Sequence, residues 1–121
     1  MGAGHTVTAL YQLKLKNPSP EEILKLKLRY KLPKEKQSRY IESFTTGDAT
    51  TFNHAHENLR FAASVAGFGM LLRGSEFKGD LTFEKIEKIA KNAIGTDEFG
   101  FREEFLALVE IAKKSGTVAT K

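Results

Sequence analysis

The sequence predicts an α+β fold, in which an N-terminal antiparallel β-meander of about three strands packs with three C-terminal α-helices. Over the first 45 residues apolar side chains alternate with polar ones, the period of a strand with one buried face. From residue 59 onward they recur at helical spacing instead. Because no helix lies between the strands, a parallel βαβ sheet is excluded.

Three stretches carry the strand pattern: residues 6–16, 24–32 and 39–45. Pro18 and Pro20 separate the first two, because proline has no N–H to donate to a ladder. A turn at residues 33–36 separates the last two. The expected apolar faces of the first two strands are Val7, Ala9, Tyr11, Leu13 and Leu15, and then Leu24, Leu26, Leu28, Tyr30 and Leu32.

The first helix is expected over residues 59–72. Apolar residues cover nearly every side of it, which is typical of a central, buried helix. Small residues, among them Gly67 and Gly69, leave part of its surface open to close approach by another element. A cation followed by glycine, Arg73 and Gly74, ends it.

Two amphipathic helices are expected to follow, over residues 83–94 and 100–114. Thr82 is the expected N-cap of the first, and Gly95 closes it. Its apolar stripe is Phe83, Ile86, Ile89, Ala90 and Ala93. The last helix is expected to bury Phe101, Phe105, Leu108 and Ala112, with Leu106, Val109 and Ile111 on its flanks.

These elements are interpreted as a single domain over residues 1–121, with a β part at 4–45 and a helical part at 52–115. The polar stretch at residues 45–51 is the candidate joint between them. A chain of 121 residues is long enough for one core. There are no internal repeats.

Composition excludes several kinds of site. Because the sequence has no cysteine, it has no disulfide, zinc-thiolate site, thiol nucleophile or iron–sulfur cluster. Its 19 basic and 15 acidic residues leave a net charge of +4, too small to identify a nucleic-acid binder without a clustered patch. No apolar run is long enough to span a bilayer, and no export signal opens the chain, so we expect an untargeted chain without a membrane span.

The histidines raise a metal hypothesis, because His54 and His56 lie close together in the sequence with His5 and Glu57 as further donors. At the start of a helix, however, positions i and i+2 diverge and cannot share one ion. The pattern favours two ordinary helix-start histidines. Asp97 near the start of the last helix is interpreted as an acceptor for exposed N–H groups there, and Arg102 as its ion-pair partner, or that of Glu98.

No catalytic constellation or nucleotide-binding loop is present, so we expect a non-enzyme with no cofactor, no metal and no catalytic residue. The expected partner surface is the basic face of the second strand. A basic sheet face can track phosphates, but Tyr11 and Tyr30 fall on the opposite, apolar faces. The pattern therefore favours a solvated or partner-covered face over a nucleic-acid interface. This face comprises Lys25, Lys27, Arg29 and Lys31, with Lys14 and Lys16 as neighbours on the first strand.

Four blocks in order carry a family resemblance: GAGHTVTALY at residues 2–11, LRYK at 28–31, FAASVAGFGMLLRG at 61–74 and FGFREEFLALV at 99–109. With them the chain resembles the C-terminal region of bacterial proteins that carry a von Willebrand factor type A domain. The metal-binding Asp-x-Ser-x-Ser motif of that domain does not occur here, so no metal role is carried over. Phe61, Phe68 and Phe105 look structural, whereas His5 and Arg102 are polar residues inside matched blocks and candidates for a functional role.

The resemblance implies an accessory or interaction module of an extracytoplasmic envelope protein. It also implies that further strands precede residue 2 in the parent protein and that this chain is a fragment. A sheet edge left without neighbours recruits a second copy, so we expect a homodimer through a strand edge. The alternative function is nucleic-acid or anionic-polymer binding through the basic face, and a small hydrolase or metal site at His54 and His56 is a third hypothesis.

Overall fold

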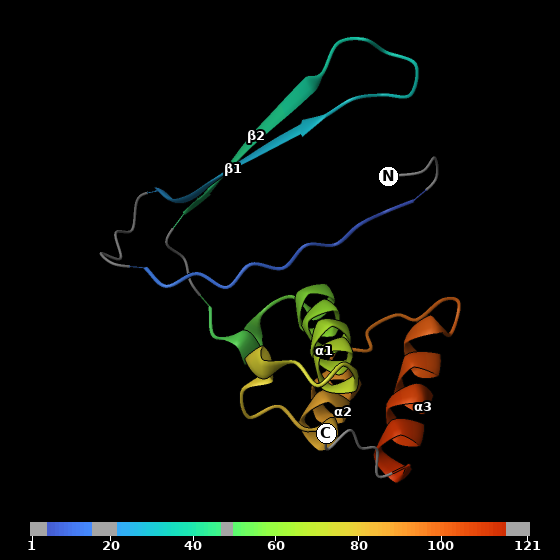
Figure 1. Cartoon of the computed structure of the whole chain (residues 1–121). Coiled ribbons are helices and arrows are strands. Elements are labelled where there is room, and N and C mark those ends of the chain that lie inside the picture. The colour runs from blue at the N-terminus through green and yellow to red at the C-terminus, as the bar shows by residue number, and fades with distance from the viewer. Residues whose placement is uncertain (1–4, 16–21, 47–49, 116–121) are drawn as a thin grey trace. The chain divides into compact units, whose positions relative to one another are not determined.

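The structure is a computed structural model that describes residues 5–15, 22–46 and 50–115. The chain divides into two compact units, Met1–Thr50 and Thr51–Lys121 (Figure 1). The first unit contains the strands and the second the helices, so the fold class is α+β, as predicted. The division falls at the end of the polar stretch that the sequence marks as a joint. That the two units form one domain stays a prediction.

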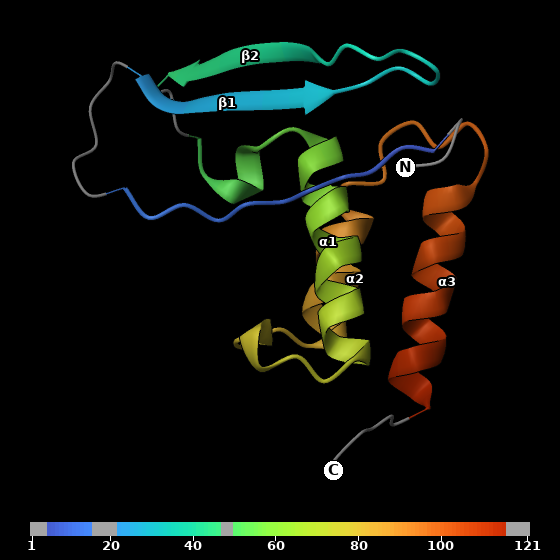
Figure 2. The ribbon, with the colours of Figure 1, turned by 45° about the horizontal axis from the view of Figure 1, so that its top comes forward.

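The β unit contains one hairpin, in which β1 (Glu22–Tyr30) pairs antiparallel with β2 (Arg39–Thr46) (Figure 2). The predicted second and third strands are thereby confirmed to within two residues. In the connecting turn, Lys34 has a φ of 68° and Glu35 donates its N–H to the Leu32 carbonyl at 3.2 Å.

The expected first strand is wrong over the residues that are described. Residues 5–15 have no strand structure, and every one of them is exposed. Alternation selects the face of a strand, but a strand also needs a neighbour for its hydrogen bonds. Within the described ranges β1 and β2 pair only with each other, and no backbone hydrogen bond reaches residues 5–15. Lys16, the last residue of the expected strand, lies outside the described residues.

The helical unit contains α1 (Glu57–Leu72), α2 (Phe83–Lys91) and α3 (Phe101–Lys114), with short 3-10 helices η1 (Phe52–His54) and η2 (Glu76–Lys78). The start of α2 and the end of α1 follow the predicted signals, whereas Gly95 does not end α2. Thr82 Oγ1 accepts the Lys85 N–H at 3.2 Å, and Gly74 takes a φ of 63° after the Arg73 cap. α2 ends three residues earlier than expected, because the chain turns at Asn92 and the Ala93 N–H already bonds to the Ala90 carbonyl.

The core of this unit forms where α1 packs on α2 and α2 on α3 (Figures 1 and 2). The rings of Phe61 and Phe68 on α1 meet the ring of Phe105 on α3 edge-on, with centroids 5.3 and 5.4 Å apart. The structural role expected for these three phenylalanines is confirmed. The fully buried side chains are Ile86, Ala90 and Ala93 of the α2 stripe, Val109 of α3 and Ser64 of α1.

α1 approaches α2 closely at one of its two candidate glycines. A Cβ on Gly67 would lie 2.6 Å from Ile86 Cδ1, so a side chain there would displace the buried isoleucine. A Cβ on Gly69 would meet nothing within 4 Å. The expected close approach is therefore confirmed at Gly67 and wrong at Gly69.

Two expectations about burial are also wrong. α1 is not enclosed on all sides, because Leu59, Val65 and Leu72 are exposed. On α3, Leu108 is 51% exposed whereas Val109 is fully buried. In a unit of three helices each helix has few neighbours. Only one stripe of each helix can therefore be covered. On α3 that stripe includes Phe105, Val109 and Ala112, and it leaves Phe101, Leu108 and Ile111 exposed.

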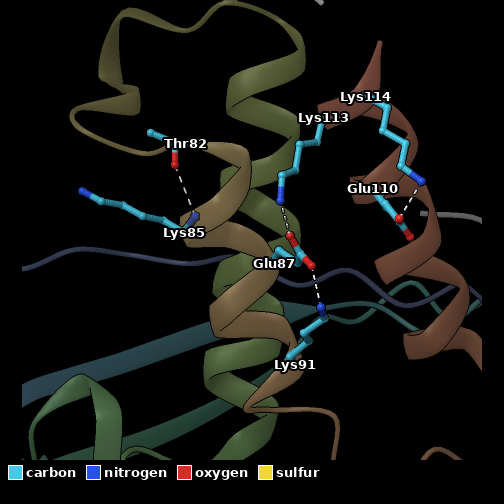
Figure 3. A network of polar contacts seen from close by, with 7 residues as sticks. All are labelled: Thr82, Lys85, Glu87, Lys91, Glu110, Lys113 and Lys114. Atoms are coloured by element: carbon cyan, nitrogen blue, oxygen red, sulfur yellow. Dashed lines mark hydrogen bonds and ion pairs between the residues drawn. The ribbon is translucent and has the colours of Figure 1, made fainter. Parts of the chain in front are cut away.

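Ion pairs connect the outer surfaces of α2 and α3 (Figure 3). Glu87 accepts hydrogen bonds from Lys91 Nζ at 2.5 Å and from Lys113 Nζ at 2.9 Å. These two ammonium groups lower the pKa of the Glu87 carboxyl to about 2, and Glu87 in turn raises the pKa of Lys113. Beside them, Lys114 pairs with Glu110 at 2.7 Å within α3.

Candidate partner-binding surface

The hairpin register places the predicted cations on one face together with residues of β2. Lys25 lies opposite Phe44, Lys27 opposite Glu42, and Arg29 opposite Tyr40. Directly opposed residues in an antiparallel pair share a face. Lys31 follows the end of β1 and is exposed. We call this the basic face of the hairpin: Lys25, Lys27, Arg29, Tyr40, Glu42 and Phe44, with Lys31 at its end.

Part of the charge on the basic face is compensated locally. Lys25 forms an ion pair with Glu42, and its ammonium lies 4.8 Å from the centre of the Phe44 ring. The Tyr40 hydroxyl donates to the same Glu42 carboxylate. Arg29 Nε donates to Ser38 Oγ at 2.9 Å, which leaves its charge unpaired among the described residues. The face thus combines three strand cations, one carboxylate and two aromatic rings.

The other side of the hairpin is apolar along β1 and is also exposed, while β2 adds Arg39, Ile41, Ser43 and Thr45 to it. Leu24, Leu26, Leu28 and Tyr30 alternate along β1 with between 37% and 52% of their surface exposed, and Ile41 lies opposite Leu28. We call this the leucine face. A two-stranded sheet with both faces in water is marginally stable, so this face is suited to be covered by another surface.

The sequence interpretation missed Tyr40 and Phe44 as members of the basic face. It compared the lysines with Tyr11 and Tyr30 and found the aromatic residues on the opposite side. The faces of β2 depend on how the turn sets its register against β1, which alternation within one strand does not reveal. A pairing of the two strands by opposite charge, Lys27 against Glu42, would have been the available signal.

The candidate residues outside the hairpin lie apart from this surface in the chain. His5 is exposed in the unpaired segment. His56 Nδ1 accepts the Asn58 N–H and caps α1, and His54 Nδ1 lies 2.9 Å from Thr51 Oγ1. No group of metal-binding side chains occurs in the parts of the chain that the structure describes. His56 thus serves the start of α1, and His54 belongs to the short helix η1 before it.

Arg102 on α3 contacts α1 and the segment that follows α2. Its Nη1 donates to the carbonyls of Ala93 at 2.9 Å and Ile94 at 3.1 Å, and its Nη2 donates to Asn58 Oδ1. Asp97 does not pair with this guanidinium: its Oδ2 accepts the backbone N–H groups of Arg102 and Glu103 instead. The expected ion pair of Arg102 with Asp97 or Glu98 is wrong, because the guanidinium satisfies two carbonyls of the segment that follows α2. The role expected for Asp97 at the start of α3 is confirmed.

Comparison with known proteins places the chain in a family. A family model described as the C-terminal region of the uncharacterized protein YfbK matches residues 1–115. Over 131 residues the chain is 34% identical to the uncharacterized protein YfbK of Escherichia coli strain K12, a match that covers 93% of this chain and 22% of that protein. The chain therefore spans about a fifth of the length of this curated relative. No solved structure matches, and none of the helices in the described ranges is long and apolar enough to cross a bilayer.

Proposed function

The chain belongs to the family of the YfbK C-terminal region, and from this premise we propose that it is a non-catalytic protein-interaction module. In this proposal it packs against, or extends, a neighbouring von Willebrand factor A domain in a bacterial envelope protein. The observation that carries the proposal is the hairpin, whose leucine face and basic face are both exposed.

The leucine face supplies the apolar part of the contact. Each leucine that becomes fully buried contributes on the order of 1 kcal/mol or more, since about half of its surface is still exposed. The exposed side chains of α3, Phe101, Leu108 and Ile111, are apolar surface of the same kind in the helical unit. This amount of uncovered apolar surface is typical of a module that completes its packing on a partner.

The basic face supplies the charge complementarity. Lys27 and Arg29 have no ion-pair partner among the described residues, and Lys25 shares its charge with Glu42. An acidic partner surface would orient the module and increase its association rate. We therefore expect the two faces to act differently: the leucine face determines the affinity, and the basic face its salt dependence.

Calorimetric titration of this chain with the von Willebrand factor A domain of its parent protein tests the proposal. Binding should show a negative heat-capacity change, which is the signature of apolar burial. Leu26→Ser should weaken binding about tenfold. The neighbouring Lys27→Gln should leave the affinity at high salt almost unchanged. It should also reduce the loss of affinity that occurs when salt is raised from a low to a physiological concentration. Circular dichroism of both variants controls for folding. The absence of binding would contradict the proposal.

A second copy of the chain is the other partner that we propose for the hairpin. Within the described residues β1 and β2 each have one edge without a neighbouring strand, and such an edge can pair with an identical one. Light scattering would then give a mass that doubles as concentration rises. A constant mass of one chain at high concentration would exclude this arrangement.

Nucleic-acid or anionic-polymer binding is the alternative function, and one observation favours it. Tyr40 and Phe44 lie on the same face as the cations, where single-strand binders have their stacking rings. Anisotropy of a labelled single-stranded oligonucleotide tests this function. If it holds, affinity should fall steeply with salt and Tyr40→Ala should weaken binding about tenfold. Weak binding that changes neither with the salt concentration nor on Tyr40→Ala would exclude the nucleic-acid function.

A further inference from the structure

The helical unit contains an open groove of about 410 Å³ on the side of α2. One wall comes from η1 and the beginning of α1, and the other from α2 together with Leu81 before it and Asn92 after it. All of its lining residues belong to the helical unit, so the groove does not depend on the hairpin. They are Phe52, Asn53, Arg60, Leu81, Lys85, Lys88, Ile89 and Asn92.

Three of the lining side chains are cations, and none is a carboxylate. Arg60 Nε donates to the Ala55 carbonyl at 3.0 Å, which fixes the guanidinium at the groove. Its two terminal amino groups make no hydrogen bond among the described residues. Lys88 likewise has no ion pair within those residues, although Lys91, one turn later, pairs with Glu87. The groove therefore concentrates positive charge that its own walls do not compensate.

Lys85 is also available to the groove. In Figure 3 its side chain extends away from Glu87 and from the ion pairs between α2 and α3. Its partner is Asp80, whose side chain is 91% exposed, and exposed ion pairs of this kind contribute little. An anion in the groove can therefore take over the Lys85 ammonium at low cost.

The remaining lining is apolar or amide. Ile89 and Leu81 are half-buried, and the Phe52 ring is partly exposed. The side-chain amides of Asn53 and Asn92 each add hydrogen-bond donors and one acceptor. Apolar walls with a few polar groups are typical of sites for small organic molecules, which have volumes of roughly 300 to 1,000 Å³.

We propose that this groove binds a small organic anion that combines an apolar, flat body with a carboxylate or phosphate group. The acidic group lies between Arg60 and Lys88, and the body lies against Phe52 and Ile89. The proposal goes beyond the interaction function above, because it concerns the other unit and a different class of ligand. Its success or failure leaves the hairpin proposal unchanged.

The test uses 2-naphthoate as the probe and its uncharged analogue 2-naphthalenemethanol, titrated into the isotopically labelled whole chain. Saturable changes of the backbone NMR signals of Arg60, Ile89 and Asn92 are expected. The neutral analogue should bind at least about fivefold more weakly, because it forms no charge-assisted hydrogen bond. Equal affinity of the two compounds, no saturable change, or changes confined to the hairpin would each overturn the proposal.

Two variants with the same charge change complete the test. Lys88→Gln should weaken naphthoate binding about fivefold and leave binding of the neutral analogue unchanged. Lys114→Gln removes one positive charge from α3, outside the groove, and should leave both affinities unchanged. An equal effect of the two variants on naphthoate would show that net charge alone attracts it, and would overturn the assignment to the groove.

Discussion

The guanidinium of Arg102 on α3 lies over the ring of Phe61 on α1, with its central carbon 4.8 Å from the ring centroid. The same side chain donates hydrogen bonds to Ala93 and Ile94 beyond the end of α2, and to Asn58 near the start of α1. One residue thereby connects α1 and α3 with the segment that follows α2, at the end of the unit where α1 and α3 begin. Its place inside a block of family resemblance has this structural explanation.

Arg102→Ala should lower the free energy of unfolding of the helical unit by about 2 kcal/mol. The loss comes from two carbonyls left without a donor and from the missing cation–π contact. Arg102→Lys should recover less than half of it, because an ammonium group cannot reach both carbonyls and Asn58 at once. Urea denaturation followed by circular dichroism measures both values. Wild-type stability of the alanine variant would contradict the connecting role.

The two glycines of α1 should respond differently to alanine. Gly69→Ala should raise the free energy of unfolding by roughly 0.5 to 1 kcal/mol, because alanine favours the helix and nothing lies within 4 Å of the new methyl group. Gly67→Ala should be at least about 1 kcal/mol less stable than Gly69→Ala, because its methyl group must displace the buried Ile86. Thermal unfolding of the two variants side by side measures the difference. Equal stability of the two variants would mean that α2 can move away from α1 without a loss of unfolding free energy.

Neighbouring residues of α3 offer a test of its buried stripe. Val109→Ala should cost on the order of 2 kcal/mol, because the side chain is fully buried and leaves a cavity. Leu108→Ala removes more atoms but should cost under about 1 kcal/mol, since half of that side chain is exposed. The comparison is made by urea denaturation. A larger loss for Leu108→Ala than for Val109→Ala would mean that α3 buries Leu108, as the sequence predicts.

Glu87 should make the stability of the helical unit depend on acid. Its pKa of about 2 in the folded chain lies below its ordinary value of 4.5, so its contribution is present above pH 4.5 and is lost as the pH falls toward 2. The stability difference between the wild type and Glu87→Gln should therefore shrink over this interval. Urea denaturation at several pH values measures it, and Glu76→Gln, which removes an exposed carboxylate of η2, is the control. A difference that stays constant down to pH 2 would contradict the ion pairs.

Local sequence patterns predicted the elements well where the structure depends on residues that are close together in the sequence. The α2 stripe, the Thr82 cap and the Gly74 stop depend on residues within one or two turns, and the structure has each of them. The expected strand at residues 6–16 and the orientation of α3 depend on neighbours instead. Alternation in a segment cannot specify whether a partner strand is present, and a helix with apolar residues on two sides does not specify which side is covered.

The candidate surface was predictable in part. The cations of β1 are visible as an alternating series, and the structure leaves them exposed. The β2 residues that share their face, Tyr40, Glu42 and Phe44, cannot be recognised in the sequence, because only the pairing register places them beside the cations. The groove at Arg60 and Lys88 was not foreseen, since its walls come from segments that are separated along the chain by α1 and η2.

The two faces of the hairpin owe their chemistry to the number of residues in the turn between Tyr30 and Arg39. If the pairing moved by a single position, Tyr40 and Phe44 would join the leucines, and Ile41 would stand among the lysines. Insertions or deletions in the turn that change the pairing by an odd number should therefore mix the faces, whereas even changes should keep them apart. The length of this turn thus maintains the polarity of the hairpin.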